Sequence, residues 1–153
     1  MKISTRARYA LRMILDIGLH SKKGSPVKLE NVAERTDISR RYLDQIVLPL
    51  KNAGLIRGIK GPGGGYVLGK SPREISLASI LKAEIGPIAL VDCVLDEDVC
   101  DKNKDCPARL VYRLLSLLIE VTLKDLSLAT LMNEKSLKRI ESRVDSLSRT
   151  LES

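Results

Sequence analysis

The sequence predicts a mainly α-helical fold with one small β-hairpin, and three observations support this. In the first third of the 153-residue chain, apolar residues recur at helical spacing in three short segments. A glycine-rich hairpin pattern follows them, and a long apolar helix begins at Pro107. Phe and Trp are absent, so the core must consist of Leu, Ile, Val and Ala. At this length the chain forms one domain, or one small domain with an appendage.

Three helices are expected before the hairpin. The first is capped at residue 4 or 5 and runs to about His20, with an apolar stripe on one face. The second covers Val27–Arg35, and a tight connection leads to Ser39, a good N-cap for the third helix. Gly54 suits the left-handed position after that helix. Pro49 lies inside it, where a proline costs about 3 kcal/mol, so we expect a kink or a tightened last turn.

Two β-prone segments, Leu55–Ile59 and Tyr66–Leu68, enclose the glycine-rich stretch of residues 60–65. Strand, glycine-rich tip and strand indicate a β-hairpin. Three helices followed by this hairpin make a winged helix-turn-helix. A short amphipathic helix from Ser76 to Glu84 should follow, and Gly86 breaks it.

The helix that begins at Pro107 should continue to about Ser127. It carries more apolar surface than so small a monomer can cover, which favours a homodimer through this helix. The alternative is that it packs only against the first helix of its own chain. A charged, partly frayed last helix is expected over residues 134–153. The chain therefore divides into a winged helix-turn-helix region (1–70), a connecting helix (71–91), a cysteine loop (92–106), a dimerisation helix (107–127) and a C-terminal helix (128–153).

Positive charge is concentrated in the N-terminal half. Residues 1–70 carry 14 Lys and Arg against 5 Asp and Glu, whereas residues 71–153 carry 12 against 14, in agreement with the net charge of +7. This distribution favours a polyanionic partner such as double-stranded DNA over ordinary solvated lysines. No apolar run reaches membrane-spanning length, and the first residues lack the apolar block of a signal peptide, so we expect a cytoplasmic protein without a membrane partner.

The exposed first turns of the third helix carry the candidate base-reading residues. These are Arg40, Arg41, Tyr42, Asp44 and Gln45. In a helix-turn-helix, the N-terminal residues of the recognition helix meet base edges in the major groove. Arg pairs bidentately with guanine, Gln pairs with adenine, and Asp accepts from the cytosine amino group. The alternative is that Asp44 and one of the two arginines form surface ion pairs at helical spacing.

The tip of the predicted hairpin suits a contact with the DNA backbone or minor groove. Gly63 and Gly64 lack a Cβ, so the backbone there can approach a phosphate or the groove floor closely. Lys60 beside them supplies positive charge to the narrow groove. A glycine run by itself is also typical of a flexible turn, but its position directly after a recognition helix favours DNA.

All three cysteines of the chain, Cys93, Cys100 and Cys106, lie in one polar loop. Thiolates are soft ligands that select zinc, copper(I) or iron–sulfur clusters. The loop lacks the CxxC pairs of most structural zinc sites, and its wider spacings suit a larger iron–sulfur cluster. An odd number of cysteines in a reducing compartment argues against a disulfide framework. Three unrelated cysteines are less favoured, because cysteine behaves as a small core residue and this loop is acidic.

Most clusters have four protein ligands, so the fourth ligand here must be an oxygen or nitrogen donor, a partner residue or a small molecule. The candidate donors inside the loop are Asp92, Asp96, Glu97, Asp98, Asp101 and Asp105. His20, the only histidine, is a weaker candidate. A zinc-loaded or thiol-oxidised loop is the rival form of sensor. The chain has no Ser/His/Asp or Cys/His set and no Walker phosphate loop, which argues against an enzyme; an electron carrier would leave the reading helix unexplained.

The chain resembles the IscR family of bacterial winged-helix regulators, which includes nitric-oxide-sensing and cysteine-metabolism relatives. The resemblance covers nearly the whole chain and rests on STRARYALRMILDIG, VAERTDISRRYLDQIVLPLKNAGLI, KGPGGGYVLGK and the three-cysteine loop. It implies a homodimer crossed through the long helix, which binds an imperfect palindrome in promoter DNA, mainly as a repressor of iron–sulfur cluster biogenesis genes. It also implies a [2Fe-2S] cluster on Cys93, Cys100 and Cys106, with [4Fe-4S] in some relatives.

Three positions depart from the family pattern. Arg109 stands where IscR members have a histidine ligand, three residues after the last cysteine, so the fourth ligand stays open. Arg8 stands where nitric-oxide-sensing relatives have an aspartate that the partner subunit supplies. Asp44 replaces a longer glutamate, so its reach to a cytosine differs and the family's DNA sequence preference is not carried over.

Overall fold

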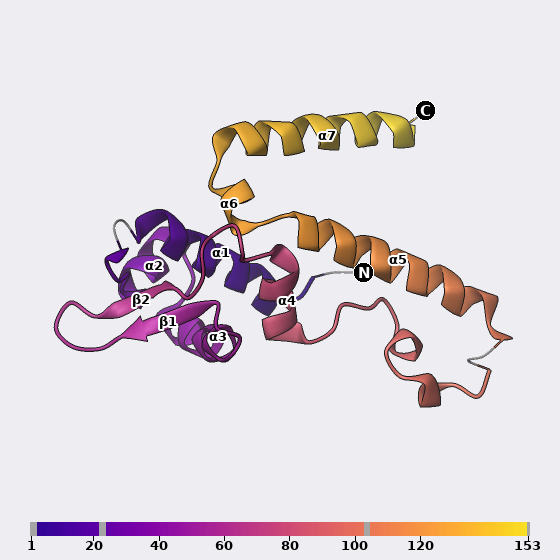
Figure 1. Cartoon of the computed structure of the whole chain (residues 1–153), viewed down its shortest axis with the longest axis horizontal. Coiled ribbons are helices and arrows are strands. Elements are labelled where there is room, and N and C mark those ends of the chain that lie inside the picture. The colour runs from indigo at the N-terminus through magenta and orange to yellow at the C-terminus, as the bar shows by residue number, and fades with distance from the viewer. Residues whose placement is uncertain (1–2, 22–23, 103–104, 153) are drawn as a thin grey trace.

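The computed structural model of the chain describes residues 3–21, 24–102 and 105–152 (Figure 1). Its helices are α1 (Thr5–His20), α2 (Leu29–Thr36), α3 (Arg40–Asn52), α4 (Leu77–Ile85), α5 (Pro107–Asp125), α6 (Leu128–Leu131) and α7 (Glu134–Glu152). Strands β1 (Ile56–Ile59) and β2 (Gly65–Leu68) form an antiparallel hairpin. Residues 92–99, between α4 and α5, contain the 3₁₀ turns η2 (Asp92–Val94) and η3 (Glu97–Val99). This order confirms the predicted mainly α-helical winged fold. Residues 1, 2, 22, 23, 103, 104 and 153 of the predicted domains lie outside the described ranges.

The start of α1 is as predicted, whereas α2 begins later than predicted. The hydroxyl of Ser4 caps α1 by accepting a hydrogen bond from the N–H of Ala7 at 3.2 Å. α2 begins at Leu29 because Val27 pairs with Tyr66 in an antiparallel bridge, through N–H···O bonds of 2.9 and 2.8 Å. A β-branched residue suits this extended pairing. The bridge ties the start of α2 to the wing.

The recognition helix α3 continues through Pro49 to its end without a break. Gly54 follows with a left-handed φ of 67°, as its position predicted. Its N–H donates to the Lys51 carbonyl at 2.9 Å, and the N–H of Leu55 donates to the Leu50 carbonyl at 3.0 Å. These two bonds form a Schellman turn, so the expected tightening is confined to the last turn of the helix.

The hydrophobic core lies between α1, α2, α3, α4 and the hairpin, with one contribution from α6. Its largest fully buried side chains are Met13, Ile14, Ile17, Leu29, Leu43, Ile46, Leu50, Leu55, Ile56, Ile75, Ile80 and Leu128. Aliphatic side chains dominate, as the absence of Phe and Trp requires. Three of these residues, Leu43, Ile46 and Leu50, lie on one face of α3, so the core holds the helix and leaves its opposite face on the surface.

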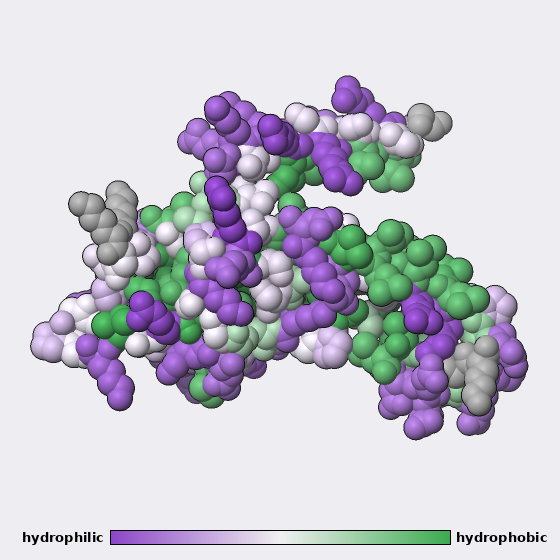
Figure 2. All heavy atoms as spheres, in the orientation of Figure 1, coloured by the Kyte–Doolittle hydropathy of each residue, from purple (hydrophilic) through white to green (hydrophobic). Residues whose placement is uncertain are grey.

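Helix α5 leaves this core, and its apolar face lies on the surface (Figure 2). Among its residues only Ser116 is buried, while eight large apolar side chains are exposed: Leu110, Val111, Tyr112, Leu114, Leu115, Leu117, Leu118 and Val121. α5 ends at Asp125 rather than at the predicted Ser127, because Ser127 caps α6. The N–H of Leu128 then donates to the Ile75 carbonyl at 2.7 Å, which returns the chain to the core.

Helix α7 follows and confirms the predicted last helix over Glu134–Glu152. It extends away from the core, and none of its residues is buried (Figure 1). Within the described ranges, no helix combines the length and the apolar content that crossing a bilayer requires.

Candidate DNA interface and cysteine loop

Contacts from α1 fix the turn between α2 and α3. Asp16 of α1 is buried, and its carboxylate accepts two hydrogen bonds from Arg35 of α2 at 2.9 and 2.7 Å. The hydrogen bond to Asp16 raises the pKa of Arg35. At the end of α2, Asp37 adopts a left-handed φ of 54°, and Arg12 of α1 donates to the Thr36 carbonyl. The recognition helix is therefore positioned by α1 through the helix that precedes it.

The predicted reading residues of α3 are exposed except for Tyr42 and Arg40, which are half-buried. Arg41, Asp44 and Gln45 are exposed. The Tyr42 ring packs edge-on against Tyr9 of α1, with centroids 5.4 Å apart and an interplanar angle of 78°. Tyr42 therefore supports the contact between α1 and α3, whereas Arg41 and Gln45 lie on the surface.

Arg40 pairs with two carboxylates. Its Nε donates to Glu30 Oε1 of α2 at 3.0 Å, and its Nη1 pairs with Asp44 one turn along α3. The hydrogen bond to Asp44 raises the pKa of Arg40, while the pKa of Glu30 is lowered by its backbone hydrogen bond and then by Arg40. The predicted alternative, an ion pair between Asp44 and one of the two arginines, is thus present in this structure. Such exposed pairs contribute little stability.

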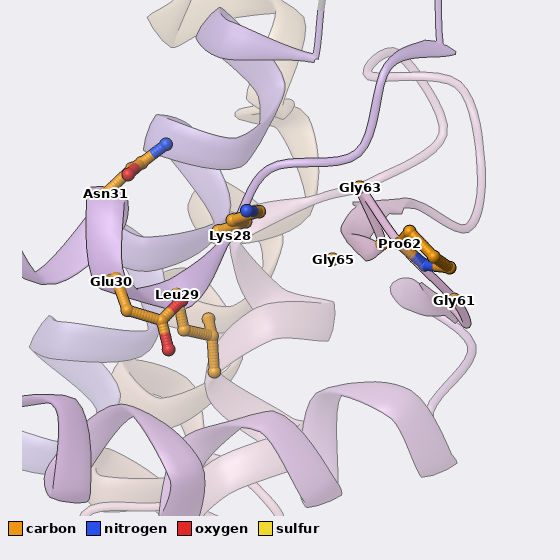
Figure 3. A pocket seen from close by; sticks show the side chains of 9 residues that line it. Lys28, Leu29, Glu30, Asn31, Gly61, Pro62, Gly63 and Gly65 are labelled. Atoms are coloured by element: carbon orange, nitrogen blue, oxygen red, sulfur yellow. The ribbon is translucent and has the colours of Figure 1, made fainter.

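Close backbone contacts shape the wing tip. A Cβ on Gly64 would lie 2.3 Å from the Ile59 carbonyl oxygen, so only glycine fits there. Gly63 has a φ of 77° but open space around it, and Lys60 is exposed. Figure 3 shows the tip facing the start of α2 across a hollow of ≈ 680 Å³, lined by Lys28, Leu29, Glu30, Asn31 and residues 61–65.

Arg6 links the recognition helix to α4. Pro49 has no N–H, so the carbonyl of Gln45, four residues earlier, loses its partner in the helix. Arg6 Nη2 donates to that carbonyl at 3.2 Å, and Arg6 Nε donates to Glu84 Oε2 of α4 at 2.6 Å. The Glu84 side chain is fully buried, and this burial raises its pKa even though Arg6 acts in the opposite direction. Sequence reasoning missed this link, although the spacing of Pro49 from Gln45 was a usable signal.

The cysteine loop joins α4 to α5 and lies at the opposite end of the molecule from the wing (Figure 1). Cys93 lies in η2, Cys100 follows η3, and Cys106 is the N-cap of α5. Cys93 and Cys106 are half-buried, Cys100 is exposed, and all three are free thiols. Within residues 3–21, 24–102 and 105–152, no three His, Cys, Asp or Glu side chains are grouped closely enough to hold a metal ion. The thiols thus share a loop without forming a ready metal site.

Several candidate fourth ligands are engaged elsewhere. The Asp96 carboxylate caps η3 by accepting from the N–H of Asp98 at 2.9 Å, and Glu97 pairs with Arg109 at 3.0 Å. His20 lies on α1, where its Nδ1 is 2.8 Å from the Asp16 carbonyl oxygen. The remaining acidic candidates, Asp92, Asp98, Asp101 and Asp105, are exposed.

Arg109 has a place in the loop that sequence reasoning did not foresee. Its Nε donates to the Cys93 carbonyl at 2.8 Å, and its Nη2 donates to Glu97 at 3.0 Å. The available signal was a cation in the first turn of a helix that has no acidic residue there.

Comparison with known proteins assigns the family. Residues 3–134 match the model of the Rrf2 family, which is described as an iron-dependent transcriptional regulator. The chain belongs to the Rrf2 family. It is therefore a DNA-binding transcriptional regulator, and proteins of this class are typically not enzymes.

Individual Rrf2-family relatives confirm the predicted resemblance. The IscR regulator of Vibrio atlanticus is 36% identical over 145 residues, which cover 95% of this chain and 83% of the relative. The structure of CymR, the global cysteine regulator of B. subtilis, is 32% identical with a TM-score of 0.70, covering 84% of this chain and 94% of that one. IscR of T. potens is 26% identical with a TM-score of 0.69 and covers 86% of each chain. The family match ends at the first residue of α7.

Proposed function

We propose that this Rrf2-family regulator, mainly a repressor, senses iron–sulfur cluster status through Cys93, Cys100 and Cys106. The assigned cofactor is a [2Fe-2S] cluster, and the assigned targets are genes of iron–sulfur cluster biogenesis. One observation carries the proposal: three thiols lie in the single loop that joins α4, packed on the DNA-reading region, to the exposed helix α5. The similarity to IscR of Vibrio atlanticus and T. potens supports it. Promoter DNA as the partner implies action in the cytoplasm.

The donor set fits a cluster in its chemistry. Thiolates are the usual ligands of iron–sulfur clusters, and none of the three cysteines is fully buried. When bound, the cluster supplies a centre that changes charge on reduction and reacts with oxidants or nitric oxide. A bound cluster would need Cys93, Cys100 and Cys106 closer together than they lie in the described structure. The guanidinium of Arg109 offers hydrogen-bond donors and no acceptor atom, so it is no ligand, and the fourth position falls to an acidic side chain, the partner subunit or a small molecule.

We infer that Arg41 and Gln45 of α3 read base edges, and that Arg40 and Asp44 join them once DNA breaks their ion pair. Tyr42 then holds the helix in place. Gln45→Ala should relax preference at one base pair by about 1–3 kcal/mol, measured by competition among single-base operator variants. No change in preference at any position would show that the reading face is wrongly placed.

We infer that Lys60, Gly63 and Gly64 at the wing tip contact the DNA backbone or the minor groove. Lys60→Ala should weaken binding to all sequences. It should also reduce the magnitude of the slope of log affinity against log salt by about 0.9 for each bound subunit, as expected for one lost phosphate contact per subunit. Lys135→Ala on α7 is the matched control and should leave the slope unchanged. Equal slopes for the wild-type protein and Lys60→Ala would remove Lys60 from the interface.

We propose that α5 forms a homodimer that matches an imperfect palindrome. The exposed apolar side chains of α5 form one contiguous face, whereas exposed apolar residues on a monomer are usually scattered singly. The α5 helix of a second, two-fold-related copy would cover this face. Leu114→Lys combined with Leu118→Lys should give a monomer in sedimentation velocity and weaken palindrome binding. Leu19→Lys, also at an exposed leucine, is the control. A dimer that survives the double substitution would assign the interface elsewhere.

The cluster claim is tested on anaerobically purified protein. Visible absorption bands with about two iron and two labile sulfide per chain are expected for the wild-type protein, and Cys93→Ala/Cys100→Ala/Cys106→Ala should be colourless. Promoter binding by the loaded and the cluster-free protein should differ, while the triple variant should behave like the cluster-free form. An unchanged spectrum in the triple variant would refute the cluster claim. About four of each element would assign a [4Fe-4S] cluster.

A second candidate is a thiol, zinc or nitric-oxide sensor that uses the same loop. The observation in its favour is that the loop includes the exposed thiol of Cys100, which is open to oxidants and to metal ions. The structural likeness to CymR, named as a cysteine regulator, is compatible with it. Zinc without iron or labile sulfide after anaerobic reconstitution would support this candidate over the cluster.

A further inference from the structure

Arg109 occupies a position where a cation is locally unfavourable. It is the third residue of α5, and the N-terminal end of a helix carries partial positive charge. The first turn contains no acidic residue that could offset this, and the N-cap, Cys106, makes no side-chain capping bond. Because a cation at this end of a helix is unfavourable, its presence suggests that contacts elsewhere in the tertiary structure offset the cost.

The compensation comes from the cysteine loop. Arg109 donates from Nε to the Cys93 carbonyl at 2.8 Å and from Nη2 to the Glu97 carboxylate at 3.0 Å. Its side chain is only 14% exposed, whereas that of Glu97 is 74% exposed. One guanidinium therefore reaches both 3₁₀ turns, η2 through Cys93 and η3 through Glu97.

These contacts fix two of the three cysteines relative to each other. Cys106 lies three residues before Arg109, at the start of the same helix, and the main chain of Cys93 is bound to the Arg109 side chain. The fork geometry of Arg suits two simultaneous bonds, which the single ammonium of Lys cannot reproduce in the same way.

We propose that Arg109 is a positioning residue that holds the main chain of Cys93 beside the start of α5 before any metal enters the loop, and that its charge favours the more negative state of the bound centre. The second part rests on the proposed cluster function, whereas the first part does not. Three thiolates make the loaded centre anionic, and reduction adds one more negative charge. A nearby, nearly covered cation stabilises that added charge, because screening by water is weak there.

The first test uses reduced, metal-free protein and backbone hydrogen exchange at residues 92–99. Arg109→Ala should speed exchange in this segment at least about ten-fold, which corresponds to about 1.4 kcal/mol of lost protection. Arg113→Ala, at an exposed arginine one turn further along α5, is the control and should leave exchange unchanged. Far-UV circular dichroism verifies that both variants fold. Wild-type exchange rates in Arg109→Ala would overturn the proposal.

The second test separates hydrogen bonding from charge with Arg109→Lys in the loaded protein. The reduction potential should become more negative in Arg109→Ala and stay near the wild-type value in Arg109→Lys, while loop exchange in metal-free Arg109→Lys should still be faster than in wild type. Equal potentials in all three proteins would overturn the charge role. If the protein takes up no cluster, the proposed function fails, and the exchange test still decides whether Arg109 positions the loop.

Discussion

Replacing Arg6 with alanine should destabilise the fold in a pH-dependent manner. Arg6 pairs at 2.6 Å with Glu84, whose side chain is fully buried. Removing one partner of a buried ion pair costs about 3–5 kcal/mol. Because Arg6 itself is 44% exposed, water screens part of this attraction, and the cost falls at or below the lower end of that range.

The loss of stability has an upper limit, because the unpaired Glu84 carboxylate can take up a proton in the variant. The loss therefore cannot exceed the free energy of that protonation. The ordinary glutamate pKa is 4.5, and each pH unit above it adds about 1.4 kcal/mol to the free energy of protonation. The upper limit is therefore about 3.4 kcal/mol at pH 7 and about 0.7 kcal/mol at pH 5. The lost hydrogen bond to the Gln45 carbonyl adds about 1 kcal/mol at both pH values. We expect Arg6→Ala to lose about 2–4 kcal/mol at pH 7 and about 1–2 kcal/mol at pH 5.

The direction of the pKa shift of Glu84 decides how stability changes with pH. Burial raises the pKa of Glu84, so the folded protein holds this proton more tightly than the unfolded chain does. The stabilising effect of the bound proton is present below the unfolded pKa and is lost as the pH rises through the folded pKa. Arg6 lowers the pKa of Glu84. Without Arg6 the folded-state pKa of Glu84 rises further, so more stability is lost as the pH increases.

Urea unfolding at pH 7 and pH 5 measures these differences in the wild-type protein, Arg6→Ala, Glu84→Gln and the double variant. Glu84→Gln removes the titrating group, so the double variant should show only a small loss that is the same at both pH values. An Arg6→Ala loss that is equal at pH 7 and pH 5 would refute the role of Glu84. Wild-type stability in Arg6→Ala would refute the link between α3 and α4 as a whole.

Three further predictions concern the wing, the reading face and α5. Gly64→Ala should cost about 1–3 kcal/mol in urea unfolding and weaken DNA binding, because the wing backbone must move, whereas Gly63→Ala, with open space but a left-handed φ, should cost about 1 kcal/mol. Asp44→Ala should raise affinity for non-specific DNA in a gel-shift titration, because it removes a negative charge and releases its arginine partner. The pKa of Glu120 is lowered to about 2 by hydrogen bonds from Lys82 and a second lysine, so its stabilising effect should be lost as the pH falls from about 4.5 toward 2. Carboxyl titration by NMR checks the value, and Glu120→Gln should weaken the acid dependence of unfolding.

Sequence by itself determined the features that depend on near neighbours in the chain. Ser39 caps α3, Gly54 takes the left-handed position after it, and Pro107 opens α5, each where the sequence predicted. The hairpin and its glycine-rich tip were predictable for the same reason. Caps, turns and helical periodicity arise from interactions within about four residues, which a single sequence displays directly.

Only the tertiary structure decided which distant segments meet. The Val27–Tyr66 bridge delays the start of α2, Arg6 reaches Glu84 across 78 positions of the chain, and Arg109 closes on the loop that precedes it. The residues next to these side chains in the sequence do not show whether they contact a distant segment or point into solvent. Long-range pairing depends on how the whole core packs and on which buried polar groups then need partners, and no short stretch of sequence contains that information.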